Sequence, residues 1–475
     1  MTQTLLADEV AQQSKRAHHK LLAAGLIGGS IEWYDFFVYG TAAALVFPKV
    51  FFPDTSSLVG TLLSFSTFSV GFIARPLGGI LAGHFGDKIG RKPMVMICLL
   101  TMGLATFIIG CLPSAQAIGV AAPVVLVALR FVQGLACGGQ WGGIVLLLTE
   151  STGPKRRGFA GTFGQMGVPL GLFLGNSAMI LANSVMSDSA FLSWGWRIPF
   201  WASALLFPVV FFIHTRVEDS AEFRQLQADV ERKRATSGQT TVAPLAEAVR
   251  KHWRKILLGA GLLSATNSAF YVAIAGFLSY GTQPVDKGGL GMDRNVVLVC
   301  IMSISALMPV VIMYTGKVSD AIGRRPLILV GAGLLMVWAF PFFWLANTAS
   351  GPLLFLAMVI SSTGQSLTYG PLAAFMGELF EPRVRYSGAS LAYQLSAVAV
   401  SGLTPLVMTW IIAETASTTG VAVYIAAMAA ITLVCAWRLP ETNGKAVRDD
   451  PDALPGIPAP GVRGSHASGV VATVR

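Results

Sequence analysis

Hydrophobic runs of about twenty residues, separated by short polar stretches, follow one another along nearly the whole chain of 475 residues. A helix needs about 20 consecutive apolar residues to cross the hydrocarbon core of a bilayer. We therefore predict an all-α membrane protein. The pattern places twelve membrane-spanning helices, at residues 21–48, 57–83, 94–112, 121–149, 159–183, 196–214, 255–280, 296–315, 326–347, 352–378, 387–412 and 418–437.

One polar stretch, residues 216–254, is longer than the others and separates the first six runs from the last six. Within it, Asp219 and Glu222 have the spacing of a helix cap and its reciprocal acid, which predicts a short surface helix. The last residues are rich in Pro and Gly and are predicted to be disordered. The predicted organisation is an N-terminal segment (1–20), a first six-helix bundle (21–215), a linker with short helices (216–254), a second bundle (255–439) and a tail (440–475).

Charge is scarce and unevenly distributed: 53% of the residues are hydrophobic and 12% are charged, whereas about 25% are charged in a typical soluble protein. All but six of the 34 Lys and Arg fall on one side of the predicted membrane, the side of both termini. Because loops rich in Lys and Arg stay in the cytoplasm, we predict cytoplasmic termini. The six exceptions are Arg75 and Arg130 inside spans, and Lys49, Arg197, Lys287 and Arg294 on the opposite side.

Several features of the sequence argue against other functional classes. The net charge of +10 reflects membrane topology, so we expect no nucleic-acid partner. The first twenty residues lack the layout of a cleaved signal peptide, so the first span is retained. The five cysteines show no disulfide framework or metal-ligand spacing. Without a metal cluster, a nucleophile motif or a phosphate-binding loop, an enzyme is not expected.

Two loop motifs occur once in each half of the chain. "GHFGDKIGRKP" (Gly83–Pro93) and "GKVSDAIGRRP" (Gly316–Pro326) share Gly, Asp, Gly, Arg and Pro at an offset of 316 − 83 = 233 residues. "ESTGPKRR" from Glu150 and "ELFEPRVR" from Glu378 share Glu, Pro and basic residues at an offset of 378 − 150 = 228 residues. Such repetition is typical of transporters built from two parallel halves.

With this loop motif after the second and the eighth span, the chain resembles the major facilitator superfamily. Its stretches "IEWYDFFVYGTAAALVF", "GFIARPLGG", "RFVQGLACGGQWGG" and "WGWRIPF" are similar to the metabolite:proton symporter family, and the first is closest to shikimate carriers. The resemblance implies twelve transmembrane helices in two pseudo-symmetric six-helix bundles. It also implies proton-driven transport of a small metabolite such as shikimate, alpha-ketoglutarate, citrate, proline or betaine, without a cofactor.

Two acids and two bases lie deep within predicted spans, all in the first half of the chain. Glu32 and Asp35 are three residues apart on one helix face, about 16 and 21 Å from the cytoplasmic end. Arg75 and Arg130 lie about 12 to 14 Å from the ends of their spans. Ionised residues are costly at such depth, so we expect all four side chains to face one central cavity. The alternative is that they clamp neighbouring helices together.

Our hypothesis is that Glu32 or Asp35 takes up the driving proton, and that Arg130, with Arg75 as the alternative, releases its carboxylate partner and binds an anionic group of the substrate. A nearby arginine favours the ionised form of a buried carboxyl group, so a substrate anion that occupies the arginine promotes proton uptake. Polar residues on otherwise apolar spans are further substrate-binding candidates, although a single polar residue in such a span more often forms an interhelical hydrogen bond. They are Tyr39, Gln133, Asn267, Tyr271, Gln365, Tyr369 and Gln394, the last beside Tyr393.

The resemblance further implies that charged networks in the repeated loops hold the cytoplasmic side closed while the cavity faces outward. Asp87 can pair with Arg91, and Glu150 with Arg157. The predicted gate residues are Gly83, Asp87, Gly90, Arg91, Glu150, Arg157, Asp320, Arg324, Glu378 and Arg385.

The sequence thus predicts a proton-coupled symporter that imports a small organic metabolite, such as shikimate or a related organic acid. We expect a monomer in the bacterial inner membrane whose partners are the substrate, protons and the lipid bilayer. Three alternatives stay open: a symporter of proline- or betaine-type zwitterions, a uniporter or exchanger, and a nutrient sensor that does not transport.

Overall fold

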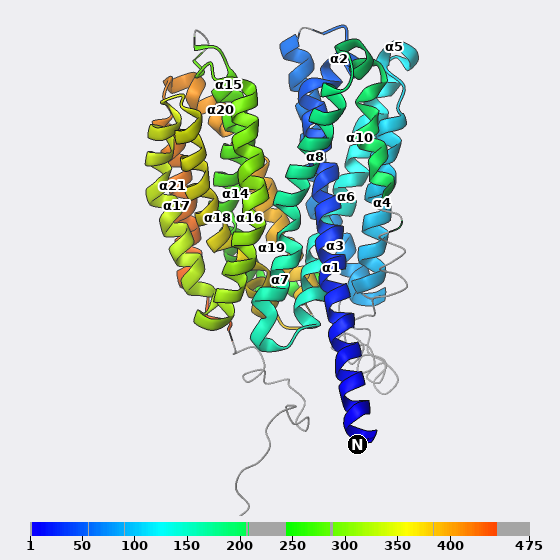
Figure 1. The fold of residues 1–475 in the computed structure, drawn as a ribbon, viewed down its shortest axis with the longest axis vertical. Helices are drawn as coiled ribbons and strands as arrows, with labels where there is room; N and C mark the ends of the chain where they lie inside the picture. Colours follow the sequence, from blue (N-terminus) through cyan, green and yellow to red (C-terminus); the bar gives the residue numbers. More distant parts are fainter. Residues whose placement is uncertain are drawn as a thin grey trace, which may run out of the picture.

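A computed structural model describes residues 2–55, 57–89, 91–205, 208, 244–285, 288–382 and 384–443. Within these ranges the chain forms helices and turns and contains no β-strand, which confirms the predicted all-α class. Two helical bundles lie side by side (Figure 1). The end of the molecule at which α1 begins is called the N-terminal side, and the opposite end, with α2, α5 and α15, is called the far side.

The first bundle contains the helices of the first six predicted spans. The sixth span is described only over its first part, and the rest of residues 196–214, apart from residue 208, lies outside the described residues. The helices are α1 (Thr2–Leu45), α2 (Phe47–Phe51), α3 (Ser57–Ile89), α4 (Arg91–Cys111), α5 (Ala115–Ile118), α6 (Ala121–Glu150), α7 (Arg157–Gln165), α8 (Gly167–Ser184), α9 (Asp188–Ala190) and α10 (Arg197–Trp201), with the short helical turns η1 (Pro154–Arg156), η2 (Phe191–Gly195) and η3 (Ala202–Leu205).

The second bundle contains the helices of the last six predicted spans. Two of these spans are interrupted by a π-helical turn, η4 (Val272–Gly276) or η6 (Ala397–Ser401). The helices are α13 (Pro244–Leu262), α14 (Ser264–Tyr271), α15 (Phe277–Thr282), α16 (Arg294–Ile322), α17 (Arg324–Ala346), α18 (Gly351–Leu379), α19 (Arg385–Ser396), α20 (Thr404–Thr415) and α21 (Thr419–Arg438).

Hydropathy alone identifies most of these spans. Nine helical segments in the described part of the chain are long and apolar enough to cross a membrane, and α3 adds a shorter apolar stretch, Ser66–Ala82. Helix α18 has 29 residues but is not among these nine, and several polar residues lie along it. Its polar residues are buried and include Ser361, Ser362, Gln365, Ser366 and Thr368. They face other helices, which allows a polar span in an apolar solvent.

The two bundles meet on the N-terminal side. Helix α7 packs against α16 and α18, and α3 and α6 pack against α19. In Figure 1 the two bundles accordingly converge near α7 and diverge toward α2 and α15. The described structure is therefore closed on the N-terminal side.

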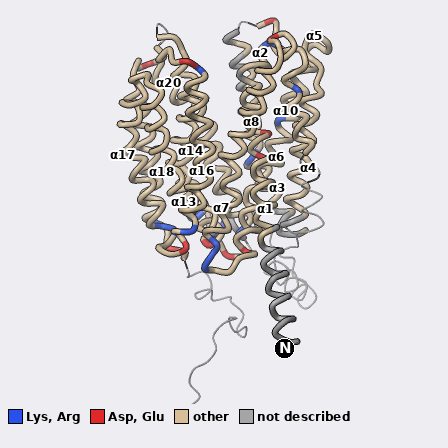
Figure 2. Tube along the Cα trace, in the orientation of Figure 1, with Lys and Arg blue, Asp and Glu red and all other residues tan. Residues whose placement is uncertain are grey.

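Charged residues collect at the two ends of the described structure. Most of the tube between the ends is uncharged, with a small charged group within the first bundle (Figure 2). Glu32, Asp35, Arg75 and Arg130 are buried in that bundle, with 1 to 4% of their surface exposed. These four residues, predicted to lie deep within their spans, are thus in the protein interior and away from lipid.

Close packing of α3 on α6 sets the position of Arg75. A Cβ atom on Gly138 of α6 would overlap the backbone carbonyl of Arg75, and one on Gly134 would overlap that of Gly71. Only glycine allows the two backbones to approach this closely. The α6 glycines therefore hold the backbone of Arg75 directly against α6.

Two predicted boundaries can be compared with the helices. Helix α1 begins at Thr2, so the predicted N-terminal segment continues the first span, as its many strong helix formers allow. Glu441 and Asn443, which the sequence analysis assigned to the tail, form hydrogen bonds with the second bundle. Residues 209–243, most of the predicted linker, and 444–475 lie outside the described residues.

Candidate functional site

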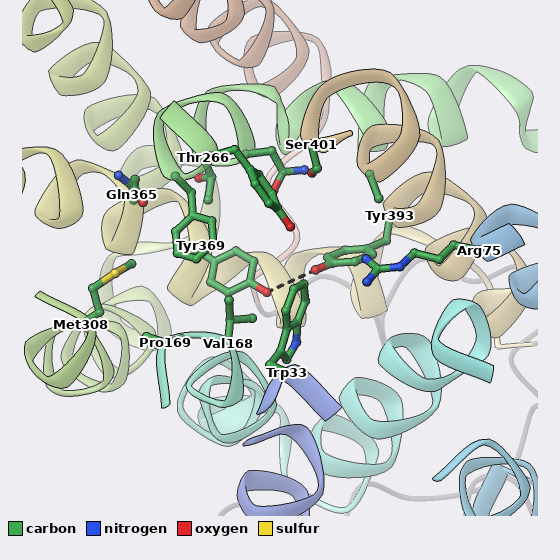
Figure 3. Close-up of a pocket in the computed structure, with 14 residues that line it drawn as sticks. Trp33, Arg75, Val168, Pro169, Thr266, Met308, Gln365, Tyr369, Tyr393 and Ser401 are labelled. Carbon is green, nitrogen blue, oxygen red and sulfur yellow. Dashed lines mark hydrogen bonds between the residues drawn. The ribbon is translucent and has the colours of Figure 1, made fainter. Parts of the chain in front are cut away.

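A cavity lies between the two bundles and is lined by both (Figure 3). Its volume is about 30 Å³, which is room for a few water molecules. The first bundle contributes Trp33, Arg75, Val168 and Pro169; the second contributes Thr266, Asn267, Phe270, Tyr271, Met308, Gln365, Tyr369, Tyr393, Ala397 and Ser401. We call it the central cavity.

The π-helical turn η6 brings two of these residues to the central cavity. Ala397 and Ser401 are the first and last residues of η6. The turn η4 directly follows Tyr271, another lining residue. Such turns are frequent at functional sites because they shift the register of side chains along a helix.

Arg75 is the only charged residue among the described residues that line the central cavity. Its guanidinium lies over three aromatic rings, 4.6 Å from Phe72, 4.7 Å from Phe36 and 5.6 Å from Trp33. In Figure 3 it extends toward the interior beside Tyr393. No hydrogen bond or ion pair holds the guanidinium within the described part of the chain, so its donors remain available to a ligand.

A second, smaller cavity of about 10 Å³ lies inside the first bundle. Arg75 lines this cavity too, and so connects it with the central cavity. We call it the acid pocket, because it contains both deep carboxylates. Its lining residues are Glu32, Asp35, Phe36, Gly71, Arg75, Met102, Arg130, Gln133, Gly134 and Cys137.

The two carboxylates are bonded to neutral donors. Asp35 Oδ2 accepts a hydrogen bond of 2.8 Å from Thr106 Oγ1, and Glu32 Oε1 accepts one of 3.1 Å from Cys137 Sγ. Asp35 Oδ1 has no hydrogen-bond partner among the described residues. No ion pair joins Glu32 or Asp35 to Arg75 or Arg130 in the described part, so the acids and bases do not clamp the helices by pairing with each other there.

Arg130 is held in a different way from Arg75. Its guanidinium lies 4.1 Å from the Tyr39 ring and 4.9 Å from the Phe68 ring, and it donates a 3.1 Å bond to Gln133 Oε1. The Tyr39 hydroxyl is bonded to Thr67 at 2.6 Å. Arg130 and Gln133 line the acid pocket and not the central cavity, and Tyr39 packs behind them. Arg130, Gln133 and Tyr39, all predicted to bind substrate, therefore lie apart from the central cavity and from the predicted substrate residues of the second bundle that line it.

Four predicted substrate residues of the second bundle do line the central cavity: Asn267, Tyr271, Gln365 and Tyr369. Gln365 Oε1 has no partner among the described residues. The fifth, Gln394, does not line it and donates to the Gly138 carbonyl at 2.9 Å. For Gln394 the structure therefore matches the interhelical alternative.

Sequence reasoning did not find several lining residues. Trp33 lies directly beside Glu32, and an aromatic residue next to a deep acid was a usable signal. The others are apolar or small residues in apolar helices and carry no signal of their own. These residues are Val168, Pro169, Thr266, Phe270, Met308, Ala397 and Ser401.

A polar and aromatic layer joins the bundles next to the central cavity. Trp141 of the first bundle stacks on Tyr393 of the second, with ring centroids 4.1 Å apart. The Trp141 indole donates to Gln165 at 2.9 Å, and Gln165 donates to the Tyr369 carbonyl at 3.1 Å. The dashed line in Figure 3 marks the 3.5 Å contact between the hydroxyls of Tyr369 and Tyr393. This layer separates the central cavity from the N-terminal side.

Predicted gate residues of the second bundle form a buried network on the N-terminal side. Arg324, fully buried, donates to Asp320 at 2.7 Å and to Glu378 at 3.3 Å. The Asp320 carboxylate also accepts from the backbone N–H groups of Gly158 (2.8 Å) and Phe159 (2.9 Å). Asp320 therefore caps the start of α7 in the other bundle.

A second contact crosses between the bundles nearby. Arg385 donates to Glu150 at 3.0 Å. Arg157 is buried at the start of α7 and has an interaction partner. Gly83, Asp87 and Arg91 lie in α3 and α4, but their side-chain surroundings, like Gly90 as a whole, lie outside the described residues.

Glu441 closes the same network from the end of α21. Its carboxylate accepts from the backbone N–H groups of Arg324 (3.0 Å) and Arg325 (2.9 Å), the first residues of α17. Thr442 donates to Glu378 at 2.7 Å. Four backbone donors at a helix start need partners, and Glu441 accepts from two of them in α17.

Comparison with known proteins identifies the family. The sequence model described as "Sugar (and other) transporter" matches residues 21–449. The chain is 36% identical to the inner membrane metabolite transport protein YhjE of Escherichia coli (strain K12), over 93% of the chain and 98% of that protein. It is 36% identical to the shikimate transporter of the same strain (86% of the chain, 91% of that protein) and 31% identical to its proline/betaine transporter (90% and 85%).

The fold matches a solved structure as well. The major facilitator superfamily proton:xylose symporter XylE, bound to 6-bromo-6-deoxy-D-glucose, superposes with a TM-score of 0.74 over 91% of this chain and 98% of that chain, at 16% identity. These relatives are transporters and not enzymes. The chain therefore belongs to the family of sugar and other transporters and is a multi-pass membrane transporter with the twelve-helix major facilitator fold.

Proposed function

We propose that the protein imports a small organic acid together with one or more protons, by alternating access between its two bundles. Arg75 is the observation that carries the proposal, because it lines both the central cavity and the acid pocket. A substrate carboxylate bound to Arg75 offsets the positive charge that Arg75 places beside Glu32 in the acid pocket. Loss of a nearby cation favours the protonated form of a carboxyl group, so substrate binding and proton uptake support each other.

The lining of the central cavity suits a small hydroxylated acid. Asn267 and Gln365 offer amides, and Thr266 and the tyrosines offer hydroxyl groups. The relative named as a shikimate transporter supports this substrate class. A cavity of about 30 Å³ is far smaller than the roughly 300 Å³ or more of a typical ligand pocket. Substrate entry therefore requires the aromatic side chains to move apart.

A zwitterion of proline or betaine type is the second candidate substrate. Aromatic faces attract ammonium groups, and Trp33, Phe270, Tyr271, Tyr369 and Tyr393 all line the central cavity. The relative named as a proline/betaine transporter supports this class. In this case Arg75 binds the carboxylate of the zwitterion and the rings surround its ammonium group.

The basic loops and the relative named as an inner membrane protein support an orientation in a bacterial inner membrane with both termini in the cytoplasm. In this orientation the N-terminal side, where the bundles meet, is cytoplasmic. The described structure then represents a state closed to the cytoplasm. The proposal concerns a monomer, since one chain provides both bundles and the central cavity.

A transport assay tests the proposal. Purified protein is first screened for thermal stabilisation by shikimate, other small carboxylates, aromatic acids and betaines. The stabilising compound is then followed in proteoliposomes, by counterflow and by uptake with and without a pH gradient, for the wild type, Glu32→Gln and Asp35→Asn. We expect accumulation driven by the gradient, and its loss in at least one variant.

Other outcomes of the transport assay support other functions. Counterflow without accumulation indicates an exchanger or uniporter, and binding without counterflow indicates a sensor. If both variants retain accumulation driven by the pH gradient, Glu32 and Asp35 are not the coupling acids.

A further inference from the structure

Thr106 of α4 lies at the centre of a hydrogen-bonded chain in the acid pocket. It is completely buried. Its hydroxyl lies 2.8 Å from Asp35 Oδ2, 2.9 Å from the Met102 carbonyl and 2.6 Å from Gln133 Nε2. Gln133 Oε1 in turn lies 3.1 Å from Arg130 Nη1. A continuous chain thus links Arg130 on α6 to Asp35 on α1 through a residue on α4.

The Arg130 guanidinium, at one end of this row of hydrogen bonds, determines the direction of each bond in it. An arginine guanidinium only donates, so Gln133 must turn its amide oxygen toward Arg130. The amide nitrogen then donates to Thr106. The Thr106 hydroxyl accepts that bond and keeps one hydrogen, for which two acceptors compete: the Asp35 carboxylate and the Met102 carbonyl.

We infer that Thr106 is a positioning residue that couples the charge of Asp35 to Arg130. Its hydrogen points to Asp35 while the carboxylate is ionised. When a proton from the medium binds the unpartnered Oδ1 of Asp35, the carboxyl group becomes neutral and the Thr106 hydrogen rotates to the Met102 carbonyl. The row of hydrogen bonds that starts at Arg130 then no longer ends on the negative charge of Asp35. The role of this switch in transport rests on the proposed function; the hydrogen-bond switch itself does not.

The other charged and titratable groups around Asp35 are the same in any Thr106 variant. They come from the helix of Asp35 and from two helices packed around it. They are Glu32, Tyr34 and Tyr39 on α1, Arg75 on α3, and Arg130 and Cys137 on α6. A change at Thr106 therefore isolates the contribution of one hydroxyl group.

The test measures the protonation of Asp35 directly, without any substrate. Infrared difference spectra of the purified full-length protein are recorded during a pH titration, and the carboxylic acid band of Asp35 is identified by its loss in Asp35→Asn. Thr106→Val keeps the shape of the side chain but removes the donor to the ionised carboxylate. We expect the midpoint of the band to rise by about one pH unit, the size expected for a hydrogen bond to a charged group. Thr106→Ser, which retains the hydroxyl, is expected to keep the wild-type midpoint.

Thr404→Val is the matched control. Thr404 is also completely buried, bonds to the carbonyl four residues earlier and has one side-chain partner, Tyr424, but it lies in the second bundle. Its midpoint is expected to equal that of the wild type. If Thr106→Val does not accumulate in the membrane, Thr106→Ala is compared with Thr106→Ser in the same way.

The inference is overturned if the variant without the hydroxyl and Thr106→Ser have the same midpoint, or if Asp35→Asn removes no titrating band. These outcomes are independent of transport. Failure of the proposed function instead shows as a wild-type protein that does not accumulate any screened compound under a pH gradient.

Discussion

Arg75 and Arg130 carry the same charge and are almost equally buried, yet their guanidinium groups have different contacts. Arg130 is anchored by Gln133. The Arg75 guanidinium lies over aromatic rings and has no hydrogen bond in the described part of the chain, and the residue lines the central cavity. A guanidinium stacked on rings keeps its in-plane donors free, which suits recognition of a carboxylate.

Replacing Arg75 by Gln is expected to weaken binding of an acidic substrate at least about tenfold, because a charge-assisted hydrogen bond contributes about 1.5–3 kcal/mol. Arg75→Lys keeps the charge but loses the planar contact with the rings, so an intermediate affinity is expected. Binding is measured by thermal stabilisation and by uptake into proteoliposomes. Arg197→Gln is the control, since Arg197 donates to the Ser193 and Leu112 carbonyls and does not line the central cavity. Wild-type affinity in Arg75→Gln would assign the substrate to another group.

Sequence reasoning found the four deep charges but could not distinguish the two arginines. Depth along a helix follows from residue number alone. The direction in which a side chain points depends on how α3 and α6 rotate against each other, which the contact of Gly138 with the Arg75 backbone determines. The bond from Gln394 to the Gly138 carbonyl was also unpredictable, because it depends on how the two bundles pack against each other.

At the scale of elements, the closed side depends on a helix start in one bundle and an acid in the other. Asp320 accepts two backbone N–H groups at the start of α7, one on each carboxylate oxygen. A carboxylate at a helix N-terminus is favoured by unpaired donors and by the helix dipole. This contact exists only while α7 and α16 are together, so it stabilises the closed arrangement specifically.

Asp320→Asn is expected to open the N-terminal side more often, since an amide offers one acceptor oxygen and no charge. A loss of about 1–2 kcal/mol reduces the ratio of closed to open protein roughly 5- to 30-fold. The measurement is the labelling rate of Ser390→Cys, introduced where α19 meets Gly142 of α6, in a Cys111→Ser background. A faster rate is expected.

The control for this experiment is Asp293→Asn. Asp293 caps its own helix, α16, through the N–H groups of Asn295 and Val296, and makes no contact between bundles in the described structure. Its labelling rate should not change. Equal rates in both variants would show that the cap of α7 does not hold the bundles together.

At the scale of the molecule, the spans were the most predictable feature. Hydropathy is a local property, so eleven of the twelve predicted spans coincide with described helices and the sixth does in its first part. The π-helical turns η4 and η6 left no trace in the hydropathy. A π-helical turn changes the backbone hydrogen bonding and leaves the order of apolar residues unchanged, so hydropathy does not detect it.

The proposed orientation in the membrane is testable with a natural cysteine. Cys111 is exposed at the end of α4 on the far side, whereas Cys98, Cys137, Cys300 and Cys435 are buried. A membrane-impermeant maleimide is expected to label intact cells, and Cys111→Ser should abolish this labelling. Labelling confined to inverted vesicles would reverse the orientation.

The bonds from Glu441 to the first residues of α17 have a consequence for biosynthesis. Arg324 and Glu441 are 117 residues apart in the chain, so α17 is made and inserted long before its cap is translated. The start of α17 must remain hydrated or be shielded by other factors during this interval. The second bundle reaches its final form only when the last described residues have emerged from the ribosome. A truncation or a fusion junction placed before Glu441 therefore removes this cap of α17, whereas one placed after Asn443 leaves it complete.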